Sequence, residues 1–145
     1  MTGYYKEMLE KGLKFQDFVV KEMYKKGIPI VSYNSKEYQY NEGENVAGFE
    51  IKFDDCMAKT GNLYIEISEK SSEEMEFFTP SGIYRNDNSW IYLIGNYSEF
   101  FLFAKKHLQA VHKRGSFKKV GNSTSNGIVI PKKSALEICV LHVEL

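Results

Sequence analysis

The alternation of hydrophobic and polar residues predicts two β-strands in the first half of the chain, residues 47–54 and 62–69. Their apolar positions are Ala47, Phe49, Ile51 and Phe53 in the first strand, and Leu63, Ile65 and Ile67 in the second. The positions between them carry acids and lysines, so each strand has one face to bury and one polar face. Because a short polar connection joins the two strands, we expect them to pair antiparallel as a hairpin.

Such a hairpin would place Glu50 and Glu66 on the same polar face of neighbouring strands. Two carboxylates that lie so close repel each other unless something positive sits between them. A divalent cation, Mg²⁺ or Mn²⁺, would satisfy both, and the nearby lysines suit the cleavage of phosphate esters. The alternative is an ordinary solvated sheet face, on which Glu and Lys are common pairing partners.

The rest of the pattern predicts an α/β (α+β) fold, with a central mixed β-sheet flanked by helices. Apolar residues at three- and four-residue spacing predict a helix over residues 13–26, which Gly27 would end. Further strands are expected at 28–33, 90–94, 99–103, 128–130 and 138–143, a second helix at 104–114, and a flexible basic connection at 115–126. In the second helix, Leu108 and Val111 would face the core.

Length and composition indicate one globular domain over residues 1–145. Hydrophobic residues make up 43% of the chain and aromatic residues 14%, which argues against disorder. The chain has no apolar run of about 18 residues and no signal-type N-terminus, so we expect a cytoplasmic protein with no membrane partner. Cys56 and Cys139 have no metal-ligand spacing and are expected to be free thiols.

Charge is unevenly distributed along the chain, although the net charge is zero. Residues 101–145 carry eight basic and two acidic side chains. A cluster predicted on the outer face of the second helix and at its end could follow a nucleic-acid backbone: Lys105, Lys106, Lys113 and Arg114. DNA is therefore a candidate partner. The alternative is a helix that merely presents its basic side chains to solvent.

The order of elements resembles the PD-(D/E)xK nuclease superfamily, to which many restriction enzymes and Holliday-junction resolvases belong. In that core a helix precedes three antiparallel strands, a helix and a strand; the second strand carries an acid and the third carries Glu-x-Lys. The segment VAGFEIKFDD would supply the acid as Glu50, and NLYIEISEK would supply the glutamate as Glu66. The resemblance covers residues 13 to about 114. The chain as a whole also resembles small phage-borne proteins that have the run STSNGIVIP near the end.

This resemblance implies a restriction endonuclease-like core and a metal-dependent nuclease, endonuclease or resolvase-like, that hydrolyses DNA. Glu50 and Glu66 would hold Mg²⁺ or Mn²⁺, and a homodimer is left open. The chain departs from the family pattern at Ser68, where the catalytic lysine is expected. Lys52 and Lys70 are the candidate replacements. If neither reaches the attacking water, the alternative is a non-catalytic nucleic-acid-binding or phage regulatory protein on the same fold.

Overall fold

The computed structural model describes residues 3–30 and 48–145, and within them the chain is an α+β protein with two four-stranded sheets. The helices are α1 (Gly3–Lys25), α3 (Met57–Thr60), α4 (Lys105–Lys113) and α5 (Lys132–Ile138), with a 3₁₀ turn η1 (Gly82–Tyr84). The strands are β1 (Phe49–Phe53), β2 (Asn62–Glu69), β3 (Thr79–Pro80), β4 (Ile91–Gly95), β5 (Glu99–Ala104), β6 (Lys118–Gly121), β7 (Ser125–Pro131) and β8 (Leu141–Glu144). Of the strand predicted at 28–33, residues 28–30 are irregular and 31–33 lie outside the described residues.

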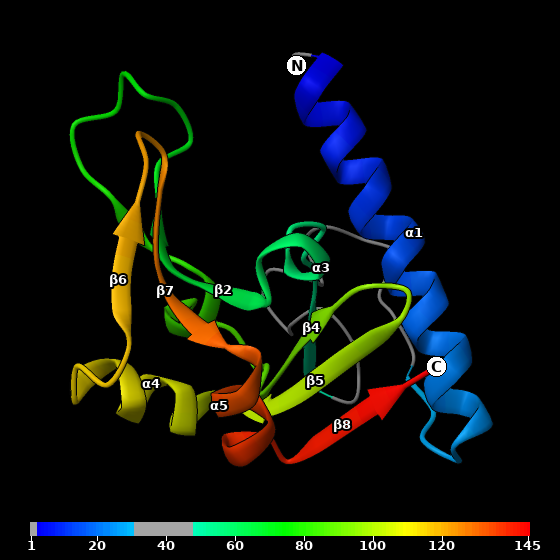
Figure 1. The fold of residues 1–145 in the computed structure, drawn as a ribbon. Helices are drawn as coiled ribbons and strands as arrows, with labels where there is room; N and C mark the ends of the chain where they lie inside the picture. Colours follow the sequence, from blue (N-terminus) through cyan, green and yellow to red (C-terminus); the bar gives the residue numbers. More distant parts are fainter. Residues whose placement is uncertain (1–2, 31–47) are drawn as a thin grey trace.

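The first sheet is mixed and has the order β1-β4-β5-β8. β1 pairs with β4 in parallel, whereas β4–β5 and β5–β8 are antiparallel. Helix α1 lies along one side of the molecule and packs against this sheet, with Phe15, Val19 and Met23 fully buried (Figure 1). The predicted first helix is therefore confirmed, although it begins ten residues earlier, at Gly3. Gly27, at φ 83°, follows its end.

The second sheet is antiparallel, has the order β3-β2-β7-β6, and packs against the other face of the mixed sheet. The core between them contains Leu63 and Ile128 from the antiparallel sheet and Tyr92 and Phe103 from the mixed one. Leu108 of α4 and Ala135 of α5 complete the same cluster. The protein therefore has two sheets with a shared core, and not the single central sheet that the sequence led us to expect.

The predicted hairpin between residues 47–54 and 62–69 is wrong, because β1 and β2 belong to different sheets. Asp54 explains the departure: its Oδ1 accepts hydrogen bonds from the backbone N–H groups of Cys56 and Met57, both at 3.0 Å. These bonds start helix α3 directly after β1, and Oδ2 accepts a third from the N–H of Tyr64 at 3.1 Å. The chain is thus turned out of the first sheet before it enters β2.

Other predicted elements are confirmed: the β4–β5 hairpin, helix α4, and strands β7 and β8. The connection at 115–126 differs from the expectation, because it contains the edge strand β6. In Figure 1 the β6–β7 hairpin and the connection after β2 project together from the rest of the molecule. Ser123 Oγ joins these two projections by donating to Glu73 Oε1 at 2.7 Å.

Cys56 and Cys139 are free, as predicted. Across residues 3–30 and 48–145, no helix has both the length and the apolar character that a membrane crossing requires.

Candidate functional site

Strand β1 directs Glu50 and Lys52 toward the antiparallel sheet. Phe49 and Ile51 pack in the cluster formed with α1, so the alternating positions point to the opposite face. Glu50 is fully buried there. Its Oε1 lies 3.7 Å from the Nζ of Lys52, and its Oε2 lies 3.6 Å from the Nζ of Lys105. The site therefore has at its centre a buried carboxylate between two ammonium groups.

Lys105 is the second of these cations, and the expectation that it faces solvent is wrong. Its side chain is 5% exposed, because residues 105, 108 and 111 recur every three positions on the inner face of α4. The Nζ lies 3.2 Å from Asp87 Oδ1, 2.9 Å from Ser89 Oγ and 3.4 Å from the carbonyl oxygen of Arg85. These partners offset the cost of burying a charge. Lys105 thus organises residues 85–89 and cannot follow a nucleic-acid backbone.

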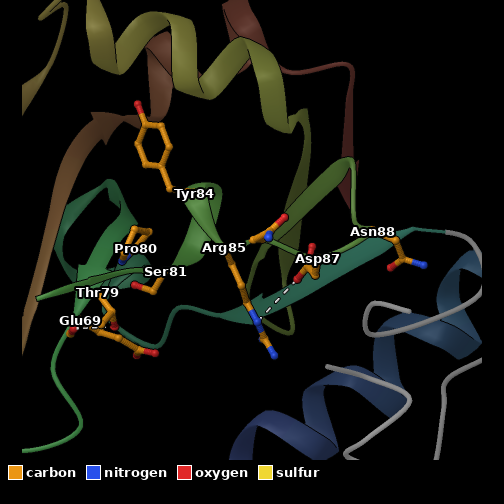
Figure 2. A pocket seen from close by; sticks show the side chains of 9 residues that line it. Glu69, Thr79, Pro80, Ser81, Tyr84, Arg85, Asp87 and Asn88 are labelled. Carbon is orange, nitrogen blue, oxygen red and sulfur yellow. Dashed lines mark hydrogen bonds and ion pairs between the residues drawn. The ribbon is translucent and has the colours of Figure 1, made fainter. Parts of the chain in front are cut away.

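Asp87 connects the loop of residues 85–89 to the site through its contact with Lys105. Burial alone would raise the pKa of its carboxyl, but hydrogen bonds from Ser89 and the nearby ammonium of Lys105 hold the pKa below its usual value. The second oxygen, Oδ2, lies 3.6 Å from the Nε of Arg85. Figure 2 shows the Arg85 side chain extending away from the loop beside Asp87. A carboxylate, a lysine and an arginine therefore form one chain of ion pairs that begins at Glu50.

Glu66 on β2 is the second predicted ligand. Ser125 Oγ donates to its Oε1 at 3.0 Å and lies 2.6 Å from the hydroxyl oxygen of Tyr64. Since Ser125 has one hydroxyl proton and gives it to Glu66, Tyr64 must donate to Ser125. Burial raises the pKa of the Glu66 carboxyl, and Glu69 adds to this, whereas Ser125, Lys52 and Ser81 act in the opposite direction. Lys52 thus acts on both predicted ligands, although they come from different sheets.

An open pocket of about 1020 Å³ adjoins these groups (Figure 2). It is lined by Glu69, Thr79, Pro80, Ser81, Tyr84, Arg85, Asn86, Asp87 and Asn88. On one wall Ser81 acts on Glu66, and on the other Asp87 contacts Lys105, which in turn contacts Glu50. Ser81 and Asp87 thus connect the pocket to the site, although neither Glu50 nor Glu66 is among the lining residues.

The two candidate catalytic lysines differ in their surroundings. Lys52 pairs with Glu50, whereas the Nζ of Lys70 lies 4.6 Å above the ring centroid of Phe78, a cation–π contact. Ser68, at the position where the family pattern has lysine, accepts a hydrogen bond from Asn126 Nδ2 at 3.2 Å. The Glu-x-Lys spacing is found instead on β1, as Glu50-Ile51-Lys52.

The remaining basic residues predicted to contact DNA are Lys106, Lys113 and Arg114. All three are exposed on α4 and at its C-terminal end, as expected. The neighbouring edge strand β6 adds Lys118 and Lys119, which are also exposed.

Two other groups of potential metal-binding side chains lie close together in the described part of the chain: Asp54, Asp55 and Cys56, and Glu99, His142 and Glu144. Asp54 already accepts the backbone hydrogen bonds that start α3. Glu99 already contacts Lys132 and His142. Protein contacts account for both acids, so neither group is treated as a metal site.

Sequence reasoning missed Asp87, Ser125 and Arg85. Asp87 and Arg85 lie in the run RNDNS, whose composition is that of a turn, and Ser125 lies in a segment taken as a connection. The three-residue spacing of Lys105, Leu108 and Val111 was the available signal that a basic residue shares the buried face of α4.

No family model, no curated protein and no solved structure matches this chain.

Proposed function

We propose that this protein is a metal-dependent nuclease, endonuclease or resolvase-like, that hydrolyses phosphodiester bonds in DNA. The observation that supports the proposal best is Glu50-Ile51-Lys52 on β1, with the buried carboxylate of Glu50 and the ammonium of Lys52 on one face of the strand. Burial raises the pKa of Glu66, and the charge of Lys52 is one of the influences that oppose this rise. The resemblance to the PD-(D/E)xK superfamily is part of this proposal. Glu50 and Lys52 of β1 are proposed as the glutamate and lysine of its Glu-x-Lys motif.

The donor set fits a hard cation. Glu50 and Glu66 offer carboxylate oxygens, the ligands that Mg²⁺ and Mn²⁺ prefer. The Nζ atoms of Lys52 and Lys105 lie 3.7 and 3.6 Å from the carboxylate oxygens of Glu50. A bound divalent ion would supply Lewis-acid catalysis and an activated water.

Lys52 is assigned the role of positioning the attacking water and balancing the negative charge that develops on the phosphate. The exposed basic residues of α4, Lys106, Lys113 and Arg114, would attract the DNA backbone. Lys105 has no part in DNA contact, because its ammonium is buried against Glu50 and Asp87.

A second function is favoured by the same cluster. Among the residues that the structure describes, it contains three carboxylates (Glu50, Glu66 and Asp87) and three cations (Lys52, Lys105 and Arg85), whose charges balance without a metal. A neutral, buried network can be purely structural. In that case the chain would be a non-catalytic nucleic-acid-binding or phage regulatory protein.

Metal binding and cleavage, measured together, test the proposal. We expect calorimetry to detect Mg²⁺ or Mn²⁺ binding to the wild type, and Glu50→Gln to remove it. We expect Lys52→Met to slow cleavage of duplex, branched or single-stranded DNA by roughly 10²- to 10⁴-fold, the usual contribution of a general acid–base group.

Lys70→Met is the matched comparison for Lys52→Met, and Glu137→Gln, an exposed position on α5, is the control for Glu50→Gln. Both should keep wild-type activity. A wild type that binds neither ion and cuts none of these substrates would favour the non-catalytic function. Equal losses in Lys52→Met and Lys70→Met would contradict the role given to Lys52.

A further inference from the structure

A second pocket, of about 470 Å³, is formed by side chains of β2, the connection after it, η1 and α4. Its volume is within the usual range for ligand sites. It is lined by Ile67, Ser68, Phe78, Pro80, Tyr84 and His112. The ammonium of Lys70 lies 4.6 Å above the ring centroid of Phe78, so it covers one face of the ring, and the rest of the ring lines the pocket. These walls, mostly apolar and partly aromatic, suit a flat ligand.

Tyr84 and His112 form the polar side of this pocket. The hydroxyl oxygen of Tyr84 lies 2.6 Å from Nδ1 of His112, and 3.5 Å from the carbonyl oxygen of Gln109. Figure 2 shows the Tyr84 side chain with its hydroxyl toward α4. Burial and the charges of Lys119 and Lys113 lower the pKa of His112, so its imidazole is neutral at pH 7. Tyr84 therefore donates its proton over the shorter contact to Nδ1, and the imidazole proton is on Nε2 as a donor.

Ser68 supplies a second donor to the pocket. Its Oγ accepts a hydrogen bond from Asn126 Nδ2 at 3.2 Å, and its own hydroxyl proton has no partner within residues 3–30 and 48–145. Nε2 of His112 likewise has no hydrogen-bond partner in this part of the chain. Two N–H and O–H donors beside apolar walls suit a ligand that carries carbonyl oxygens on a flat ring.

The side of the pocket formed by α4 is positively charged. Lys113 follows His112 at the end of α4, and Lys119 is exposed on the edge strand β6, where its charge acts on His112. Of the acids that lie nearby in sequence, Glu69 lines the larger pocket instead and Glu76 is exposed. The charges around the pocket therefore suit a flat group that is attached to an anionic backbone.

We infer that this pocket binds one unpaired base of a DNA strand, whose phosphates lie toward Lys113 and Lys119. The faces of a base are apolar enough for the walls of the pocket, and the carbonyl oxygens of thymine, cytosine or guanine can accept hydrogen bonds from His112 and Ser68. A base that is paired and stacked in a duplex could not enter. This inference rests on the proposed function for the choice of DNA, and it adds that the bound DNA is single-stranded or contains an unpaired base.

The test compares two fluorescein-labelled strands of equal length, about ten residues: oligothymidylate, and a strand built from tetrahydrofuran abasic units. The two strands carry the same charge and differ in their bases. Fluorescence anisotropy in EDTA measures binding, so that neither metal nor cleavage is needed. The wild type should bind oligothymidylate about tenfold more tightly or better, the effect expected of one base held against an aromatic side chain.

Phe78→Ala should lower this preference to about threefold or less and leave the affinity for the abasic strand unchanged. Phe77→Ala is the matched control, because Phe77 is 72% exposed and is not among the lining residues. His112→Leu removes the ring donor without a change of charge at pH 7, and it should lower the preference as well. Lys119→Gln should instead weaken both strands by the same factor, because contacts to phosphate do not depend on the base.

Thermal unfolding of each variant shows whether it has folded, and His112→Leu decides the matter if Phe78→Ala has not. The inference is overturned if the wild type binds neither strand or binds both equally. It is also overturned if a folded Phe78→Ala keeps the same preference as Phe77→Ala.

Failure of this inference is distinguishable from failure of the nuclease proposal. A preference for oligothymidylate that Phe78→Ala lowers, in a protein that binds no metal and cuts no DNA, would support the base pocket and count against catalysis. Cleavage of DNA by a protein that binds both strands equally would support catalysis and overturn the base pocket.

Discussion

Glu50 and Glu99 lie on the same mixed sheet and both contact lysines, yet their surroundings differ. Glu99, on β5, is 14% exposed and accepts a hydrogen bond from Lys132 Nζ at 2.5 Å, while His142 Nε2 lies 2.9 Å from its other oxygen. Glu50, on β1, is fully buried, and its two lysines lie 3.6 and 3.7 Å away. One carboxylate has short contacts near the surface, and the other has longer ion pairs in the interior.

The difference indicates what each carboxylate can do. Burial would raise the pKa of the Glu99 carboxyl, but the hydrogen bonds from Lys132 and His142 hold it below its usual value. These contacts join β5 to α5 and β8, so Glu99 is best explained as a structural junction. Glu50 instead shares Lys105 with Asp87, and Asp87 lines a pocket. A fully buried carboxylate that contacts two lysines, one of which also holds a pocket-lining residue, is the arrangement that favours a functional role.

The largest expected effect is on stability, when Lys105 beside Glu50 is replaced and compared with replacement of Lys132 beside Glu99. Lys105→Met would leave Glu50 and Asp87 buried with a missing cation, and should lower the free energy of unfolding by roughly 3–5 kcal/mol. Lys132→Met should cost about 1 kcal/mol or less, because the Lys132 side chain is 41% exposed. Urea denaturation measures both, with the exposed neighbour Lys106→Met as the control.

Equal losses in Lys105→Met and Lys132→Met would show that the two carboxylates are held in the same way. The comparison between them would then carry no functional meaning.

A smaller effect should appear in the pH dependence of stability at Glu66 and Glu99. The pKa of Glu66 is raised by burial, so its carboxylate destabilises the folded state increasingly as the pH rises from its usual pKa to the raised one, and fully above that. Glu66→Gln should therefore raise the free energy of unfolding at pH 7 by about 1 kcal/mol or less, and the gain should shrink toward pH ~4. The pKa of Glu99 is lowered despite its burial, by Lys132 and His142, so Glu99 stabilises the fold above its usual pKa. Glu99→Gln should lower stability at pH 7, and its cost should shrink as the pH falls.

Urea denaturation at the two pH values gives the sign for each variant. If Glu66→Gln and Glu99→Gln changed the free energy of unfolding in the same direction at pH 7, the predicted contrast between a destabilising and a stabilising carboxylate would be wrong.

The fold was predictable where local pattern decides it. The three- and four-residue spacing of α1 and the period-two alternation of β1 and β2 correctly predicted the faces that pack in the apolar clusters, but the opposite face of β1 is buried as well, at Glu50. Alternation determines which face of a strand is buried but does not identify its partner, and for that reason the pairing of β1 with β2 was wrong. The partner depended on Asp54, whose hydrogen bonds to three backbone N–H groups start α3 and redirect the chain.

The candidate site was predictable only in part, for a similar reason. The period-two alternation of the two strands singled out Glu50, Lys52 and Glu66, because it placed them on the polar faces. Lys105 was assigned to the surface because lysine is rarely buried unless it is paired, and its partners Glu50 and Asp87 lie 55 and 18 positions earlier in the sequence. The helical spacing with Leu108 and Val111 could indicate that Lys105 is buried, but nothing local identifies the acids with which it pairs.

The smallest expected effect concerns the hydroxyl groups that hold Glu66. Ser125 donates to its carboxylate and so favours the charged form, and Ser125→Ala should raise the pKa of Glu66 further above its usual value. Protons and metal compete for the same oxygens, so Mg²⁺ binding in this variant should require a higher pH than in the wild type. Tyr64→Phe should act in the same direction but more weakly, because Tyr64 reaches Glu66 only through Ser125.

Calorimetric titration with Mg²⁺ across a pH series gives the measurement, and Thr124→Ala removes a neighbouring hydroxyl as the control. If Ser125 acts through the charge of Glu66, the affinities of the variant and the wild type should converge at high pH, where the carboxyl is ionised in both, and separate as the pH falls. A variant whose affinity is lower by the same factor at every pH would show that Ser125 only shapes the site. No comparable shift is expected from Glu99. Its hydrogen bonds come from Lys132 on α5 and His142 on β8, whereas Ser125 donates to Glu66.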